Sequence, residues 1–117
     1  MAAALYLING DNPGQFEARA ISVIGTPVRV GEQVGAVVRI DPPIDPEWDS
    51  PISEALIVPR HRDVRIEEIR NGFVSRPADV FVCRFRNAGA RLADEVSTSD
   101  VSIVFWGLVI NAGDVVR

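Results

Sequence analysis

The most informative hydrophobic pattern lies in residues 100–110, DVSIVFWGLVI, which are apolar on both faces of an extended chain. Alternation puts Val101, Ile103, Phe105 and Val109 on one face, and Val104, Trp106, Leu108 and Ile110 on the other. A strand with one solvent-exposed face instead alternates apolar and polar residues. We therefore expect this strand either to lie between two covering layers or to use its second face as a subunit contact.

Shorter apolar runs predict further strands at residues 4–8, 15–24, 28–30, 34–40, 54–58 and 78–87. Residues 62–69 also suit a strand, which would end before the turn signal Asn71-Gly72. Residues 41–51 contain four prolines, and proline removes a backbone donor, so we expect this segment to be irregular.

Helical periodicity is weak, and eight prolines and nine glycines interrupt the chain at short intervals. This spacing is typical of an all-β sandwich or barrel. We predict one all-β domain over residues 1–117, a β-sandwich of jelly-roll-like or immunoglobulin-like type. A small closed β-barrel shows the same strand pattern and is the alternative.

The distribution of charge is uneven. The net charge of −4 argues against general nucleic-acid binding. Residues 1–59 contain three arginines and eight acidic residues, and residues 60–91 contain eight arginines and four acidic residues. Residues 92–117 contain one arginine and four acidic residues. We expect the basic middle segment to pair with the acidic flanks of its own chain; the alternative is head-to-tail pairing with the flanks of a second copy, which would set the register of an oligomer.

No run approaches the roughly 20 apolar residues of a membrane helix. The N-terminus, MAAALYLI, lacks the basic start of a secretory signal. The sequence therefore predicts no membrane partner, and it leaves a virion and the cytoplasm both open as locations.

The densest cluster of functional groups is PRHRDVR, residues 59–65, in which His61 and Asp63 would share one strand face. Such a pair serves acyl transfer when a nucleophile lies beside it, but the chain has no Gly-x-Ser-x-Gly motif. A single histidine excludes a multi-histidine metal centre, and the acids of residues 41–49 lack the spacing of a calcium loop. We expect no catalytic residue, metal or cofactor, and a small hydrolase is the least favoured function.

Four arginines form a candidate site for an anionic ligand: Arg60, Arg62, Arg84 and Arg86. Guanidinium groups bind phosphate or carboxylate through paired hydrogen bonds, although the acids of residues 41–54 are alternative partners within the fold. The single cysteine, Cys83, cannot form an internal disulfide and is expected to be a buried thiol.

Tryptophan combines a large apolar area with one hydrogen-bond donor and is enriched at protein contacts. Trp106 lies in the doubly apolar strand, where a core role is equally consistent, and Trp48 lies in the proline-rich segment. The candidate subunit-contact residues are Phe105, Trp106, Leu108 and Trp48.

Two segments resemble known virion and jelly-roll proteins. VFVCRFRNAGARLAD resembles a strand, turn and link of small β-sandwich proteins in tailed-phage virions, and SIVFWGLVI resembles the closing strand of jelly-roll trimers of the tumour-necrosis-factor type. The resemblance implies a virion assembly role such as capsid decoration, with a trimer favoured. We therefore expect a non-catalytic structural protein that acts by self-association or docking, with an anion-binding barrel as the alternative.

Overall fold

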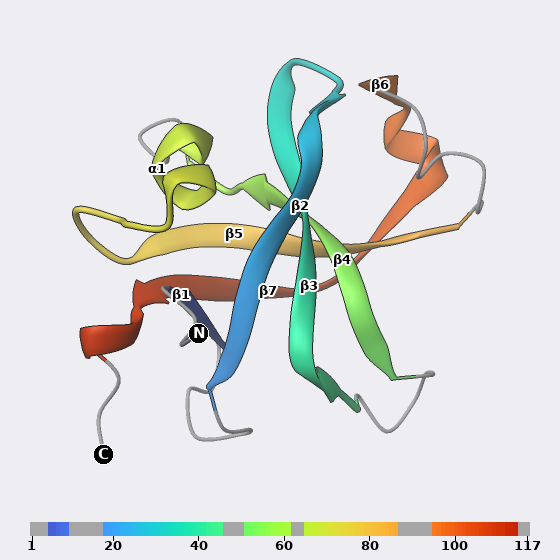
Figure 1. Ribbon diagram of the computed structural model, residues 1–117. Coiled ribbons are helices and arrows are strands. Elements are labelled where there is room, and N and C mark those ends of the chain that lie inside the picture. The colour runs from blue at the N-terminus through green and yellow to red at the C-terminus, as the bar shows by residue number, and fades with distance from the viewer. Residues whose placement is uncertain (1–4, 10–17, 46–50, 62–64, 87–94, 115–117) are drawn as a thin grey trace.

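The computed structural model describes residues 5–9, 18–45, 51–61, 65–86 and 95–114 (Figure 1). The strands are β1 (Leu5–Asn9), β2 (Arg19–Val30), β3 (Gln33–Ile44), β4 (Ile52–Pro59), β5 (Ala78–Phe85), β6 (Glu95–Val96) and β7 (Val101–Asn111). One helix, α1 (Ile66–Asn71), joins β4 to β5, and two 3-10 turns, η2 (Thr98–Asp100) and η3 (Ala112–Asp114), flank β7. The predicted all-β class is confirmed.

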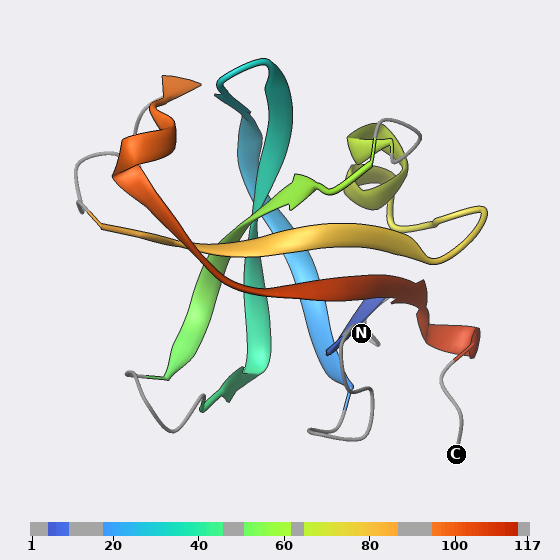
Figure 2. The ribbon, with the colours of Figure 1, turned by 180° about the vertical axis from the view of Figure 1, so that it is seen from behind.

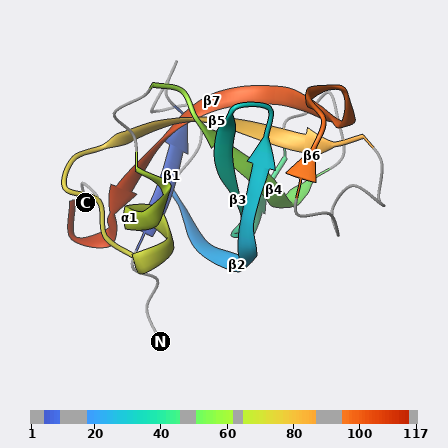
Figure 3. The same ribbon diagram turned by 90° about the horizontal axis from the view of Figure 1, so that it is seen from above.

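The sheet closes on itself. The strand order is β1-β7-β5-β4-β3-β2-β6, and β1 pairs with β2 as well as with β7. Six antiparallel strands therefore form a barrel, to which β6 adds a short parallel pairing beside the tip of the β2–β3 hairpin (Figure 3). Of the two predicted architectures, these pairings give the closed form.

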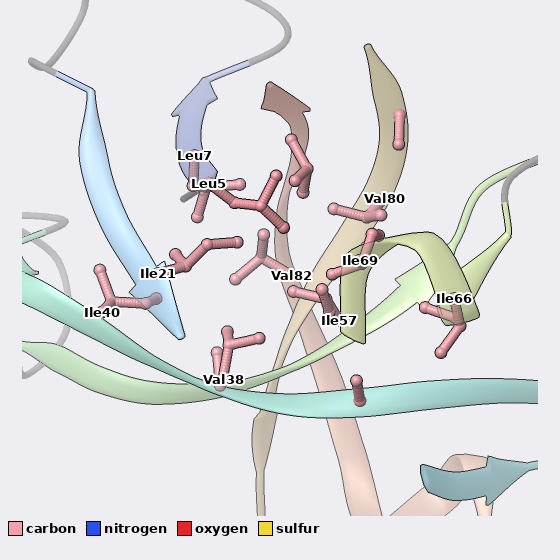
Figure 4. Close-up of a cluster of buried hydrophobic side chains, with 14 of the residues drawn as sticks. Leu5, Leu7, Ile21, Val38, Ile40, Ile57, Ile66, Ile69, Val80 and Val82 are labelled. Atoms are coloured by element: carbon pink, nitrogen blue, oxygen red, sulfur yellow. The ribbon is translucent and has the colours of Figure 1, made fainter. Parts of the chain in front are cut away.

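The barrel interior is filled by aliphatic side chains from every strand of the closed sheet (Figure 4). Leu7, Ile57, Val80, Val82 and Val109 are fully buried there. Burying each such side chain stabilises the fold by about 1.5–3 kcal/mol relative to exposure.

A second apolar cluster lies on the outer face of β3, β4 and β5. Residues from β2, β6 and the start of β7 cover this face, and the buried members are Val28, Val30, Val37, Leu56, Val58, Cys83, Val96 and Val101. Strand β4 is therefore apolar on both faces because both are covered. Cys83 is buried in this cluster, as predicted.

The strand predicted over residues 62–69 is wrong, because α1 begins at Ile66. Ile66 and Ile69 are three residues apart, so both lie on the helix face that packs into the barrel core. Gly72 ends the helix with φ +83°, in the left-handed region that favours glycine. The Asn71-Gly72 signal therefore marks a helix end instead of a hairpin.

The irregular structure predicted from residue 41 onwards is wrong at its beginning, because β3 continues to Ile44 through Pro42 and Pro43. The pairing of β3 with β4 shifts register between Arg39 and Ile44. The prolines occupy this shifted stretch, where the ladder does not require their missing donors. Residues 46–50, with Trp48, lie outside the described residues.

Candidate interaction surface

A β-bulge decides which side chains of β7 face outward. Val82 on β5 pairs with Phe105, whereas the next residue, Cys83, pairs with Ile103. Val104 is the extra residue, and both Val104 and Phe105 pack against the barrel core. The sequence-based alternation, which put Val101 and Ile103 on the side of Phe105, is therefore wrong at this point.

The outward side chains of β7 form one apolar surface with their neighbours on β1 and β5. Cross-strand pairing sets Trp106 beside Phe81, Leu108 beside Ile8, and Ile110 beside Tyr6. We call this set the β7 outer face: Tyr6, Ile8, Phe81, Ile103, Trp106, Leu108 and Ile110. Most members are half-buried, and Ile103 is 60% exposed. Apolar side chains that gather on the outside of a folded chain are candidates for an interaction site.

Arg60 lies over the aromatic part of this face. Its Cζ atom is 4.3 Å from the centroid of the Trp106 ring and 6.0 Å from that of Phe81. The backbone N–H of Arg60 donates to the carbonyl oxygen of Asp79 at 3.0 Å, which fixes the chain where it leaves β4. A cation over an aromatic ring is attracted by about 0.5–1 kcal/mol at an exposed site. Among the described residues, no carboxylate pairs with the Arg60 guanidinium.

Among the described residues, the side chain of His61 contacts Asp79. Its Nε2 atom is 3.1 Å from Oδ2 of Asp79; the His61 side chain is exposed and that of Asp79 is half-buried. The predicted partner, Asp63, lies outside the described residues. Within the described part of the chain, neither His61 nor Asp79 is paired with a side chain that offers a nucleophile, so the pair has the geometry of a surface contact between an imidazole and a carboxylate.

The four candidate anion-binding arginines are not assembled into one site by the described residues. Arg60 lies at the level of Asp79, whereas Arg84 lies five residues further along β5, about 17 Å away. The Arg84 guanidinium donates to the carbonyl oxygen of Pro51 at 3.2 Å, and Arg86 is exposed beyond it. Arg62 lies outside the described residues.

The candidate contact residues are similarly divided. Trp106 and Leu108 lie on the β7 outer face, and Phe105 packs inward against the barrel core. Trp48 lies outside the described residues. Sequence reasoning did not connect Arg60 with Trp106, because only the β4–β5–β7 pairing brings them together.

An open groove of about 750 Å³ lies at the end of the barrel that carries α1. The tip of the β2–β3 hairpin, the end of β4 and the start of α1 line it. Its charged groups have both signs, with Arg65 set against Glu32 and Glu67, and His61 also lines it. This mixture selects no single class of ligand.

Burial raises the pKa of Cys83 to about 11, so its thiol stays protonated and unreactive near neutral pH. In the described ranges, no three His, Cys, Asp or Glu side chains gather as a metal site would require. No helix among these residues has the length and apolar character needed to span a membrane.

The chain matches no family model, and neither a curated protein nor a solved structure proved significantly similar to it.

Proposed function

We propose that this chain is a non-catalytic assembly protein that works by burying the β7 outer face against another protein subunit. The subunit is a second copy of the chain or a component of a larger assembly. A viral particle is the setting we propose, from the resemblance of the segments around β5 and β7 to virion proteins.

One observation supports the proposal: β7 carries apolar side chains on its outer face as well as on the inner face that packs against the barrel core. Val109 and Phe105 supply the inner packing, so Trp106, Leu108 and Ile103 are not needed for the barrel interior. Ile103 alone leaves 60% of its surface exposed. Aromatic and aliphatic side chains in such a patch are the usual anchors of a protein interface.

The experiment is the mass of the purified 12.8 kDa chain in solution, measured by light scattering after size exclusion. We expect an oligomer, with a trimer favoured, and we expect Trp106→Arg to yield a folded monomer. Because Trp106 also supports Arg60, Ile103→Arg provides a second variant at a site exposed enough to leave folding intact. Val34→Arg is the matched control, since Val34 is 41% exposed on β3, away from β7.

An oligomer that survives both Trp106→Arg and Ile103→Arg would refute this use of the β7 outer face. If Trp106→Arg unfolds the chain and Ile103→Arg leaves the oligomer intact, Trp106 is a core residue and the proposal fails in the same way.

A further inference from the structure

We propose that the Arg60–Trp106 part of the β7 outer face binds residues 41–43 of a second copy of this chain, Asp-Pro-Pro at the end of β3. The inference rests on the proposed function and deepens it, because it assigns both the occupant of the face and the head-to-tail order of the copies.

The receiving side is Arg60 held over two aromatic rings. Its distances of 4.3 Å to the Trp106 ring and 6.0 Å to the Phe81 ring restrict the guanidinium to the outer surface. The nearby carboxylate of Asp79 is already engaged by His61 at 3.1 Å. A guanidinium that is pre-ordered by stacking keeps its N–H donors available for a carboxylate. Arg60 therefore provides a carboxylate-binding group beside an aromatic surface.

The matching groups lie at the end of β3. Asp41, Pro42 and Pro43 are consecutive and all exposed. Within the described residues, Asp41 forms no salt bridge. Proline rings dock on aromatic side chains in many recognition surfaces, and their restricted backbone loses little entropy on binding. The segment thus offers a carboxylate for Arg60 and two apolar rings for the part of the β7 outer face that lies beside Arg60.

Strand register shows that the two sites cannot meet within one chain. Ala36 pairs with Ile57, which places Arg60 at the level of Gln33, and the Gln33 Nε2 atom donates to the carbonyl oxygen of Pro59 at 3.0 Å. Asp41 lies eight residues further along β3, about 27 Å away. Figures 1 and 2 show the end of β3 and the α1 end of the barrel on opposite sides of the molecule.

A contact between two different surfaces is heterologous, so it closes into a ring or continues as a filament. The two paired groups set the same order. Arg60 lies beside α1, and Asp41 lies at the opposite end of β3. Head-to-tail copies bring these two unlike charges together, whereas side-by-side parallel copies keep them at opposite ends.

The test is a charge exchange in the full chain, followed by sedimentation velocity over a concentration series. We expect Arg60→Glu and Asp41→Arg each to weaken self-association about tenfold or more, because each places like charges together. The double variant, Arg60→Glu with Asp41→Arg, should restore association to nearly the wild-type level. Arg86→Glu is the control, since it makes the same charge change at an exposed site beyond the opposite end of β5.

The possible failures separate the two proposals. A wild-type chain that stays monomeric overturns the inference about a second copy. If Ile103→Arg dissociates the oligomer but both single charge reversals leave it intact, the inference is overturned and the proposed use of the β7 outer face stands. If both reversals weaken association and the double variant gives no recovery, Arg60 and Asp41 do not meet, and the inference is again overturned.

Discussion

Gly35 on β3 is the position where the structure makes its sharpest prediction about stability. A Cβ atom built on Gly35 would lie 2.6 Å from the carbonyl oxygen of Ile57, 3.2 Å from Cδ1 of Leu56 and 3.3 Å from Cγ2 of Val58. The nearest of these atoms belongs to the backbone of β4, so it cannot move aside by a rotamer change. We therefore expect Gly35→Ala to force β3 away from β4.

Two opposing effects set the magnitude. Overpacking a well-filled site costs about 1–3 kcal/mol. Replacing glycine by alanine also restricts the unfolded chain, which stabilises by about 0.4–1 kcal/mol where the folded backbone accepts alanine. Because a backbone atom lies inside the contact limit, the cost of overpacking exceeds the gain from the restricted unfolded chain. We expect Gly35→Ala to lower the free energy of unfolding by about 2 kcal/mol. For a domain of this size such a loss lowers Tm by about 8 °C, which thermal unfolding followed by circular dichroism measures directly.

Gly113 supplies the matched control, because a Cβ atom there meets no heavy atom within 4 Å. Gly113→Ala should therefore leave Tm unchanged or raise it slightly. If Gly35→Ala is as stable as the wild type while Gly113→Ala behaves as expected, the close approach of β3 to β4 is wrong. The packing of the second cluster on the outer face of the barrel would then need revision.

Two further predictions concern single side chains. Asn111 donates to the carbonyl oxygen of Val74 at 2.7 Å and accepts from its N–H at 2.9 Å, so Asn111→Ala should cost about 2 kcal/mol in urea unfolding. Asn111→Asp keeps the acceptor for the Val74 N–H but sets a second acceptor oxygen against the Val74 carbonyl. The Val74 amide should therefore lose protection in hydrogen exchange in Asn111→Ala and keep it in Asn111→Asp, and unchanged protection in Asn111→Ala would contradict the contact. Because burial raises the pKa of Cys83 to about 11, the unfolded chain loses its thiol proton first as the pH rises above about 8.5. The free energy of unfolding should then fall between that pH and about 11. A Cys83→Ala variant with the same alkaline slope as the wild type would show that another group is responsible.

Local patterns predicted the all-β class because the sequence signal of a strand extends over only a few residues. Alternating apolar side chains and frequent prolines and glycines require no knowledge of distant partners. The burial of Cys83 was accessible in the same way. The pattern of β7 correctly signalled two apolar faces, although it assigned individual residues to them incorrectly.

The helix shows the limit of such patterns. Ile66 and Ile69 are compatible with a short strand or with one face of a helix. Over six residues, the sequence alone does not distinguish the two-residue repeat of a strand from the 3.6-residue repeat of a helix. Packing of both side chains against the barrel core decides for the helix. The bulge at Val104 is similar, because one extra residue reverses the direction of every preceding side chain relative to those that follow.

The sequence by itself determined that this chain builds strands, buries its thiol and carries separated charges. Only the tertiary structure decided that β1 pairs with two strands and closes a barrel, and that Arg60 reaches Trp106. The physical reason is the range of the interactions. Strand propensity and alternation act between near neighbours, whereas closure, register and the stacking of Arg60 depend on the summed packing of residues far apart in the chain.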